Sequence, residues 1–423
     1  MDMNRIVFIY LPGQAEAVPA GKLDMSTNRA GDFDHASFRY GAKYLERHAA
    51  LDVDPVSAKR GELGEVLTPV NGLGMFGAIR DAAPDSWGRR VIENRLRREG
   101  PLEEWLYLDH AGSERAGALD VRPEPNSPAA ATALPGTIEL RYLLDAADRI
   151  EAGEDVPAKL MHYFEGGPTM GGMRPKAVIS MDGRQYVAKF PSKKDRFNVP
   201  AVERATLELA RQAGLNVPAT ELVSMPDGRS VMLIERFDRE PLDNGLQARR
   251  HMVTALTMLG LYEMESPDAR YADIADVISQ RGPACRVAED RTELFGRMVF
   301  NILVHNDDDH LRNHSFLYDA QGGGWTLSPL YDVVPAPVAA MERDLHLSIG
   351  PMGRAARLDN AFQGAGQFKL LDKHALMIID RIHRVVREWR TTFEALGMSK
   401  KECDQVASAF SHAKHLGIEN LPT

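Results

Sequence analysis

The sequence predicts an α+β protein in which a β-rich part is followed by a mostly helical part. In the β-rich part, Asp182-Gly183 separates two short apolar runs, a pattern typical of a β-hairpin, and Asp227-Gly228 repeats this pattern further along. From about Leu246 onward, apolar residues recur instead at helical spacing. These observations favour two lobes of different secondary structure.

An additional N-terminal subdomain is expected over residues 1–120. The stretch RIVFIYL predicts its first strand. Asp85 is the expected N-cap of an amphipathic helix that contains Trp87 and ends before Gly100. Residues 118–136 are rich in proline, alanine and serine, and we interpret them as a linker.

Two lobes are expected after this linker. We place the β-rich lobe at residues 137–242 and the mostly helical lobe at 243–423. Within the helical lobe, apolar residues at helical spacing predict one helix over 291–306. They also predict a single long helix over 374–397, which Gly397 ends.

Composition narrows the classes of protein. The 423 residues carry a formal net charge of -9, which argues against nucleic-acid binding by bulk electrostatics. Cys285 and Cys403 are the two cysteines, and their wide separation disfavours a disulfide framework or a thiolate zinc site and suits a reducing cytoplasm. We expect neither a signal peptide nor a transmembrane helix.

The polar stretch HNDDDHLRNHSF follows the helix predicted over 291–306. It places Asp308 and Asn313 five residues apart, in a loop at the helix end. In phosphoryl transfer an aspartate accepts or orients the hydroxyl proton, while an asparagine and a second aspartate hold the metal, and kinase catalytic loops have this spacing. Asp332 follows across a predicted hairpin, where the metal-binding aspartate is needed.

A histidine–aspartate metal site is the alternative for this stretch. His310 and His314 are four residues apart, and His305 precedes His310 by five. However, the sequence around His314 is typical of a strand, which removes the shared helical face. We therefore expect His310 to organise the loop by hydrogen bonds. A purely structural polar turn is the remaining alternative.

A glycine-rich segment over residues 166–172 precedes the first hairpin. Backbone N–H groups of such loops contact phosphate oxygens, although a plain flexible loop has the same composition. Lys189 ends the following strand, where a lysine either enters a cleft and neutralises phosphate or stays solvated. Glu203, on the helix predicted after it, is a candidate partner for that lysine.

Together these motifs resemble the HipA family of bacterial serine/threonine kinases, the toxin halves of type II toxin–antitoxin modules. The resemblance covers nearly the whole chain. GMFGAIRDAAPDSWGRR resembles the N-terminal subdomain of the family, GGMRPKAVI its glycine-rich loop, YVAKFPS its ATP lysine and ERFDR its hinge. HNDDDHLRNHSF and LSPLYDVVP match its catalytic and metal motifs. The resemblance implies a two-lobed, protein-kinase-like fold.

The resemblance also implies a role for each matched residue. Asp308 would be the catalytic base, because it lies two residues before His310 and five before Asn313. Asn313 and Asp332 would ligate Mg²⁺, and His310 would lie at the ATP site.

The ATP-binding residues implied by the family lie earlier in the chain. Lys189 would bind the nucleotide phosphates, with Gly171 and Gly172 in the glycine-rich loop above them. Glu235 and Phe237 would supply the hinge contacts to adenine.

Two positions depart from the family pattern. The family's self-phosphorylated serine falls on Thr169, and phosphorylation there ejects the loop and inactivates the kinase in family members. Asp307 stands where many members have threonine, which adds a charge beside the base.

The resemblance further implies partners. The target would be a translation factor, foremost an aminoacyl-tRNA synthetase such as glutamyl-tRNA synthetase, and the outcome would be growth arrest or persistence. A small helix-turn-helix antitoxin, similar to HipB, would bind the chain and supply most of the DNA contact. The alternative is a catalytically weak corepressor that acts within the antitoxin–DNA complex.

Overall fold

The computed structural model divides the chain into two compact units. The first unit comprises Met1–Lys193 and Leu233–Leu261, and the second comprises Lys194–Met232 and Tyr262–Thr423. The structure describes residues 3–27, 33–98, 100–130, 134–157, 172–243, 245–337, 343–410 and 416–422. This division into two units does not decide the three predicted domain ranges, which stay predictions.

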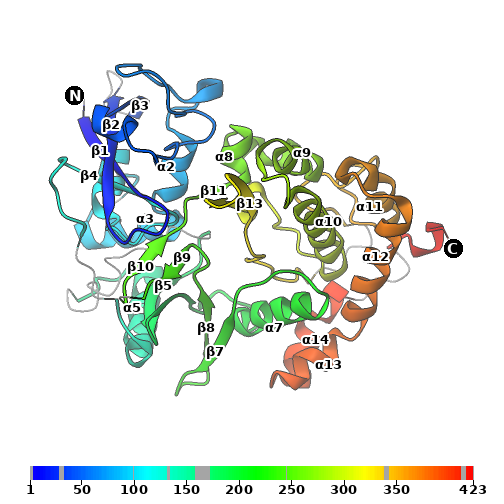
Figure 1. The fold of residues 1–423 in the computed structure, drawn as a ribbon. Helices are drawn as coiled ribbons and strands as arrows, with labels where there is room; N and C mark the ends of the chain where they lie inside the picture. The colour runs from blue at the N-terminus through cyan, green and yellow to red at the C-terminus, as the bar shows by residue number, and fades with distance from the viewer. Residues whose placement is uncertain are drawn as a thin grey trace. The chain divides into compact units, whose positions relative to one another are not determined.

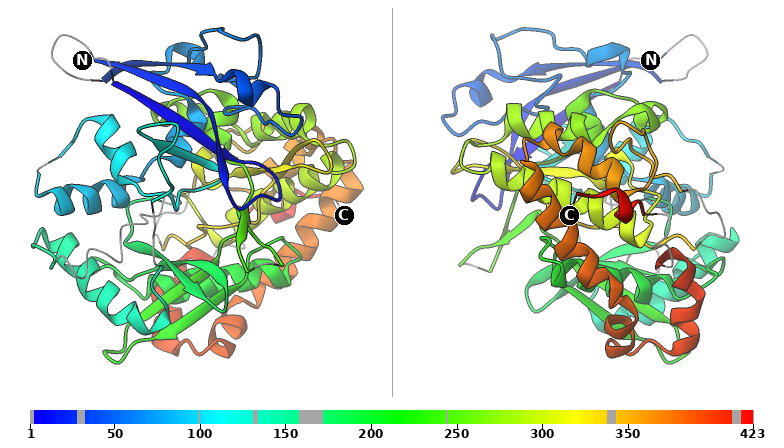
Figure 2. Two further views of the ribbon diagram at one scale, coloured as in Figure 1. Left: turned by 60° about the vertical axis from the view of Figure 1, so that its left-hand side comes forward. Right: turned by 90° about the vertical axis from the view of Figure 1, so that its right-hand side faces the viewer.

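The first unit opens with a four-stranded antiparallel sheet of order β3-β2-β1-β4, drawn in blue and cyan in Figures 1 and 2. Its strands are β1 (Met3–Tyr10), β2 (Ala17–Thr27), β3 (Phe33–Tyr40) and β4 (Leu119–Arg122). The first strand agrees with the sequence-based prediction. The linker predicted from residue 118 is wrong at its start, because every residue of β4 is buried and pairs with β1.

The first unit contains further helices and strands. They are α1 (Ala42–Leu45), α2 (Gly77–Ala82), α3 (Ser86–Leu96), α4 (Glu104–His110), α5 (Leu140–Ala152), β5 (Lys176–Met181), β6 (Arg184–Lys189), β9 (Arg239–Pro241), β10 (Gln247–Arg249), β11 (Met252–Thr254) and α8 (Ala255–Leu259). β5 and β6 belong to a second four-stranded sheet. β8 (Ser230–Glu235) enters this unit at Leu233 and lies next to β6.

Helix α3 begins as the sequence predicts. The Asp85 carboxylate accepts a hydrogen bond from the Gly88 amide at 2.9 Å, which satisfies one of the free N–H groups of the first turn. Trp87 is fully buried and donates to the Lys176 carbonyl at 2.9 Å. The helix ends at Arg97, which adopts a left-handed conformation before Gly100.

Both predicted hairpins form. β5 and β6 pair in register from Lys176 opposite Lys189 to Met181 opposite Arg184. The two turn residues have positive φ, 50° at Asp182 and 75° at Gly183, as a tight hairpin turn requires. The second Asp-Gly dipeptide likewise lies in the turn between β7 (Thr220–Ser224) and the first half of β8.

The second unit is mostly helical. Its other elements are α7 (Val199–Gln212), α9 (Tyr271–Arg281), α10 (Val287–Val304), β12 (Ser315–Asp319), β13 (Gly324–Leu327), α11 (Leu358–Gly364), α12 (Asp372–Arg387), α13 (Trp389–Ala395) and α14 (Lys400–Phe410), with short 3-10 turns η4 (Glu263–Asp268), η5 (Leu311–Asn313), η6 (Ala365–Phe368) and η7 (Ile418–Asn420). α10 lies at the centre, and α9, α11 and α12 pack against it. Its apolar stripe is buried as predicted.

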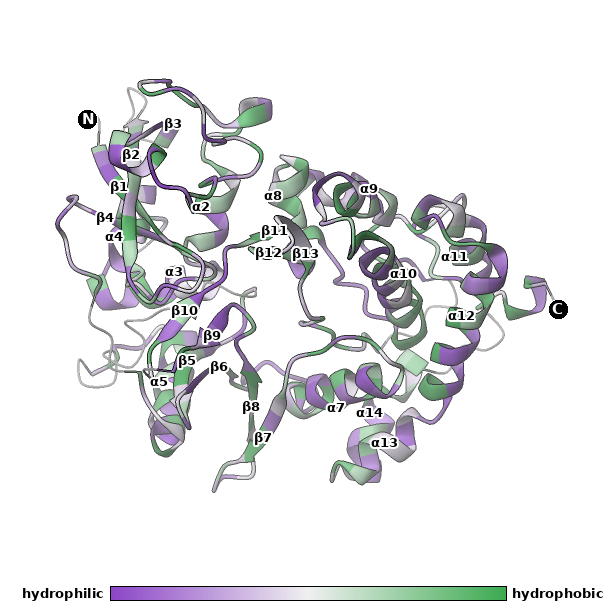
Figure 3. Cartoon of the chain, viewed as in Figure 1, coloured by the Kyte–Doolittle hydropathy of each residue, from purple (hydrophilic) through white to green (hydrophobic). Residues whose placement is uncertain are grey.

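The single helix predicted over 374–397 is wrong. The chain leaves the helical conformation at Glu388, so α12 and α13 are separate helices. Directly after this break, the Trp389 ring stacks on Phe410 of α14 with a centroid separation of 4.2 Å. α12 alternates hydrophobic and hydrophilic residues, as the colours in Figure 3 show.

Within the described ranges, no helix has the length and apolar composition that crossing a membrane requires.

Candidate active site

The stretch that carries the predicted catalytic residues follows α10 directly. His305 ends the helix in a left-handed conformation with φ 51°, which turns the chain away from the helix axis. Its ring donates from Nδ1 to the Ala336 carbonyl at 2.8 Å. The Asn306 amide donates to the Asn301 carbonyl at 3.0 Å. The helix end and the loop after it are therefore fixed by main-chain and side-chain bonds.

Asp308 and Asn313 lie together in this loop. The Asp308 side chain is 77% exposed. The Asn313 side chain is buried, and its Nδ2 donates to the Asp308 carbonyl at 2.7 Å. This bond fixes which way the Asn313 amide faces. The five-residue spacing therefore closes a loop in which a buried amide supports the backbone of an exposed carboxylate.

Asp332 belongs to the same cluster. The Tyr331 hydroxyl donates to the Arg312 carbonyl at 2.7 Å and bonds to the Ser315 hydroxyl at 2.6 Å. These bonds hold the segment of Asp332 against the loop that follows Asp308. Asp332 has φ 58°, a left-handed conformation that aspartate and asparagine adopt more readily than most residues.

The groups around Asp308 shift the pKa of its carboxyl group. The Asp308 side chain is exposed, but surrounding protein atoms displace part of the nearby water, which raises the pKa of Asp308. The His310 imidazole, whose Nε2 lies 3.9 Å from Asp308 Oδ1, opposes that rise. The negative charges of Asp332 and Asp307 add to it. The structure thus brings Asp308, His310, Asn313 and Asp332 together, while the role of each stays a prediction.

The three histidines do not form a metal centre. His314 is buried against the Tyr271 ring with a centroid separation of 5.4 Å, and burial lowers its pKa to about 3. His305 is engaged with a carbonyl. Across the residues that the structure describes, no three His, Cys, Asp or Glu side chains gather as they would around a metal ion. The histidine–aspartate alternative therefore lacks geometric support.

An oxygen-ligand site for Mg²⁺ fits the residues better. Asn313 offers a carboxamide oxygen and Asp332 a carboxylate on adjacent segments. Mg²⁺ is usually held by one or two protein carboxylates and completes its coordination with water and substrate phosphates. Asn313 and Asp332, as a pair of protein ligands, are consistent with this usual Mg²⁺ coordination.

The predicted nucleotide-binding residues belong to the first unit. Lys189 is 7% exposed and ends β6, opposite Lys176 of β5. Glu235 ends β8 and pairs with Arg184, and Phe237 lies in the turn that follows β8. Lys189 thus lies at a strand end as predicted, while the roles of Lys189, Glu235 and Phe237 stay predictions.

The glycine-rich segment is only partly described. Thr169 and Gly171 lie outside the described residues. Gly172 is exposed, and its carbonyl accepts a hydrogen bond from the Lys176 ammonium at 2.6 Å.

Lys176 is a residue that the sequence-based argument missed. It is 1% exposed, and its Nζ also contacts the Asp85 carboxylate at 2.7 Å. Burial raises the pKa of Asp85, although the Lys176 charge and the Gly88 amide oppose this. A lysine at the first position of an apolar strand was the available signal, but its partner is about ninety positions away in sequence.

The ERFDR turn is held by buried charges. Arg236 donates to the Asp238 carboxylate at 2.9 Å and to the Arg115 carbonyl at 2.7 Å. Asp238 is fully buried and accepts a hydrogen bond from the Gly117 amide at 2.7 Å. Arg239 donates to the same Arg115 carbonyl, also at 2.7 Å. The turn that contains Phe237 is thus bonded to the segment just before β4.

Glu114 completes this network. Its carboxylate lies 3.3 Å from Arg249, 3.4 Å from Arg239 and 3.8 Å from Arg236. Burial alone would raise the pKa of Glu114, but these three guanidinium groups lower it to about 2. Glu114 therefore carries its charge in the folded protein at neutral pH.

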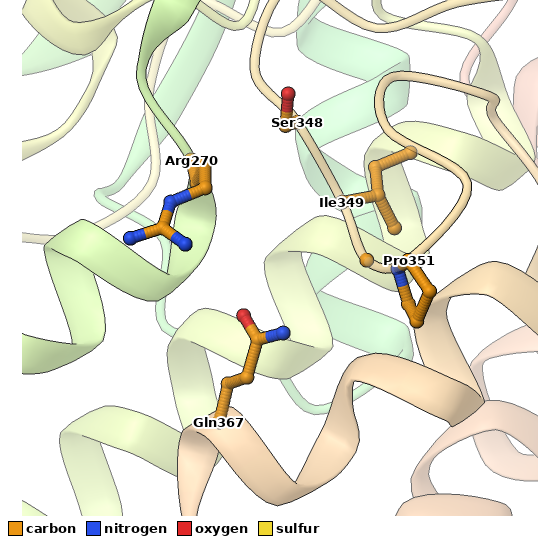
Figure 4. Close-up of a pocket in the computed structure, with 6 residues that line it drawn as sticks. Arg270, Ser348, Ile349, Pro351 and Gln367 are labelled. Atoms are coloured by element: carbon orange, nitrogen blue, oxygen red, sulfur yellow. The ribbon is translucent and has the colours of Figure 1, made fainter.

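The second unit also has a pocket of about 220 Å³ (Figure 4). Arg270 and Gln367 face it from one side, and Ser348, Ile349 and Pro351 from the other. None of the predicted site residues lines it, and Arg270 is already paired with Asp273.

Comparison with known proteins identifies the family. The family model for the HipA-like C-terminal domain matches residues 169–389, which is more than half of the chain. The chain belongs to the HipA family. The resemblance inferred from the motifs is thereby confirmed.

Curated relatives carry kinase names. The putative kinase Y4mE of Sinorhizobium fredii is 26% identical over 337 residues, which cover 73% of each chain. The serine/threonine-protein kinase toxin HipA of Shewanella oneidensis is 27% identical over 251 residues, covering 53% of this chain and 54% of that protein.

A solved structure shares the fold. A chain of the complex of HipA, HipB and operator DNA from Shewanella oneidensis MR-1 matches with a TM-score of 0.67. The match covers 96% of this chain and 95% of that one at 17% sequence identity, so it bears on the fold alone. The predicted fold class, α+β with a HipA-type kinase-like fold, is confirmed.

Proposed function

We propose that this HipA-family chain is an ATP- and Mg²⁺-dependent protein serine/threonine kinase. The observation that carries the proposal is the cluster of Asp308, Asn313 and Asp332. An exposed carboxylate lies on a fixed loop, beside the two oxygen ligands that a phosphoryl-transfer site needs. Relatives across most of the chain are named as kinases, which supports the same chemistry.

Each residue has a defined task in this proposal. Asp308 accepts the proton of the attacking serine or threonine hydroxyl as its oxygen bonds to the γ-phosphorus. The bond from the γ-phosphorus to the bridging oxygen breaks, and ADP leaves with that oxygen. Asn313 and Asp332 hold Mg²⁺, which neutralises phosphate charge when bound. His310 supports the loop beside Asp308.

The nucleotide is held by residues of the first unit. In this proposal Lys189 neutralises phosphate charge, and Gly171 and Gly172 are assigned the role of supplying backbone N–H groups to the phosphate oxygens. Glu235 and Phe237 provide the hinge contacts to adenine. The buried network around Arg236 and Asp238 supports this assignment, because it gives the hinge turn a fixed backbone.

Family membership supports a proposal for the biological target. We propose that the chain phosphorylates a translation protein, foremost an aminoacyl-tRNA synthetase such as glutamyl-tRNA synthetase, and thereby arrests growth. Thr169 is the proposed site of self-phosphorylation in the glycine-rich loop.

A small helix-turn-helix antitoxin is the proposed partner. The related fold was solved in a complex of HipA, HipB and operator DNA, which supports a HipB-like partner for this chain. The net charge of -9 fits an arrangement in which the antitoxin makes most of the DNA contact.

The proposal is tested by incubating the purified chain with γ-labelled ATP, Mg²⁺ and glutamyl-tRNA synthetase. We expect the wild type to label itself or the synthetase and Asp308→Ala to label neither. Asp319→Asn, which removes an acidic charge at the end of β12, is the matched control and should label as the wild type does. Absence of wild-type labelling, together with antitoxin-dependent repression of the operator, would favour the corepressor alternative.

A further inference from the structure

The carboxylate of Asp309, next to the proposed base, is buried in the second unit. The residue is 1% exposed, whereas the Asp308 side chain is 77% exposed. Asp309 Oδ2 accepts a hydrogen bond from the Tyr271 hydroxyl at 2.5 Å, and Oδ1 accepts one from the His346 amide at 2.7 Å. Burial raises its pKa to about 7, although these donors and the Leu347 amide oppose the rise. Three other residues of the chain, Tyr271, His346 and Leu347, thus converge on a carboxylate that the proposed chemistry does not use.

The main partner of Asp309 is itself anchored. Tyr271 is the first residue of α9 and is fully buried. Its hydroxyl also accepts a hydrogen bond from Asn301 Nδ2 of α10 at 2.9 Å. Its backbone amide donates to the Ser348 carbonyl at 3.0 Å. Asp309 is therefore attached to α9, to α10 and to the segment around residue 347.

A second tie reinforces the same arrangement. The Ser266 hydroxyl accepts a hydrogen bond from the Leu311 amide at 3.1 Å and bonds to His346 Nε2 at 3.1 Å. Ser266 is 4% exposed, so both bonds are shielded from water. The loop is thus held on both sides of His310, at Asp309 and at Leu311.

We call the hydrogen bonds that hold Asp309 and Leu311 the clamp. The clamp restricts the position of Asp308. Asp307 and Asp308 are exposed, while Asp309 is buried. Because adjacent residues share a peptide plane, fixing the Asp309 side chain limits how far the Asp308 backbone can shift. From the other side, Asn313 Nδ2 holds the Asp308 carbonyl. A shift of about 1 Å in a reacting group can lower a rate about 100-fold.

We propose that Asp309 is a positioning residue of the phosphoryl-transfer site, which holds the catalytic loop against α9 and residues 346–347 so that Asp308 keeps its reactive placement. The inference rests on the proposed kinase function. Asp308 has an acidic neighbour on each side, Asp307 and Asp309. The proposal explains Asp309, whose side chain is buried in the protein interior.

The test compares Asp309→Asn with Asp359→Asn in the full chain. Asp359 is also a buried carboxylate of the second unit, and it accepts the Asn420 amide at 2.7 Å and pairs with Arg357. Both substitutions replace one buried carboxyl group by a carboxamide with little change of volume. For each protein we would measure thermal unfolding, the dissociation constant for MgATP, and the single-turnover rate of phosphoryl transfer from γ-labelled ATP.

A positioning role predicts a split between rate and binding. Asp309→Asn should lower the transfer rate about 10- to 100-fold and change the MgATP dissociation constant less than about threefold. Asp359→Asn should destabilise the chain without this loss of rate. Tyr271→Phe, which removes one of the hydrogen bonds, provides a milder variant if Asp309→Asn does not fold, and should lower the rate in the same direction.

The outcomes separate the two proposals. A wild type that transfers no phosphate to any acceptor overturns the proposed function, and the inference falls with it. An active wild type whose rate drops no more in Asp309→Asn and Tyr271→Phe than in Asp359→Asn overturns the inference alone. Hydrogen exchange gives a readout independent of activity, because the clamp predicts faster exchange at the amides of His346 and Leu311 in Asp309→Asn than in Asp359→Asn.

Discussion

Asp332, a proposed Mg²⁺ ligand, has an unusual backbone conformation. Its φ of 58° is reached at little cost by asparagine and aspartate, because their short polar side chains bond to nearby backbone groups. Asparagine therefore preserves the local backbone while it removes the negative charge. This makes Asp332→Asn a cleaner probe of metal binding than Asp332→Ala, which would add backbone strain.

We expect Asp332→Asn to keep the fold and to lose phosphoryl transfer by more than about 100-fold, because the proposed Mg²⁺ ligand loses its charge. Circular dichroism and thermal unfolding would check the fold, and γ-labelled ATP would check the transfer. Toxicity that persists when this variant is expressed in a host without the antitoxin would contradict the prediction.

Individual residues were predictable where a local pattern carried the signal. That Asp308 and Asn313 share one loop after a helix could be predicted from their five-residue spacing, while their roles stay predictions. Tyr271, Lys176 and Asp309 could not be assigned, because their partners are tens of residues distant and are set by tertiary packing. Asp309 is 1% exposed and contacts Tyr271, yet in sequence it cannot be told from its exposed neighbours.

Secondary-structure elements were likewise predictable where a local sequence signal determines them. Asp182-Gly183 specified a hairpin because positive φ is needed at both turn positions, and Asp85 specified a helix start because its carboxylate satisfies a free amide. The break at Glu388 and the strand β4 were missed. Trp389 after the break stacks on α14, and β4 pairs with β1; both contacts join residues distant in sequence, so local patterns do not predict them.

The ERFDR turn is an element whose stability should depend on pH through Glu114. The folded-state pKa of about 2 lies below the ordinary value of 4.5, so the ionised form stabilises the folded state. This contribution is fully present above about pH 4.5 and is lost as the pH falls towards 2. We expect Glu114→Gln to lower the free energy of unfolding by on the order of 3 kcal/mol at pH 7.

The difference between wild type and Glu114→Gln should shrink as the pH approaches 2, as chemical denaturation at a series of pH values would show. Glu240→Gln is the matched control, since Glu240 is half exposed and pairs with Arg250 at 3.4 Å. It should change stability by less than about 1 kcal/mol. An equal effect of the two variants at pH 7 would count against a special role for the buried network.

At the scale of the whole molecule, net charge distinguishes direct DNA binding by this chain from indirect binding through the antitoxin. A chain with net charge -9 gains little from releasing counterions, so we expect the purified protein alone not to bind a duplex that contains the operator at about 150 mM salt. With a helix-turn-helix antitoxin present, it should join the antitoxin–DNA complex. Such an antitoxin is expected to be encoded by a gene beside that of this chain.

The salt dependence of binding distinguishes indirect from direct contact. If the antitoxin makes the phosphate contacts, adding this chain should leave the slope of log K against log salt concentration unchanged while the complex grows in mass. Fluorescence anisotropy of a labelled operator duplex, measured with the antitoxin alone and with both proteins, gives the two slopes. A slope steeper by several units in the ternary complex would show that this chain contacts many phosphates itself, through a local basic surface that its net charge conceals.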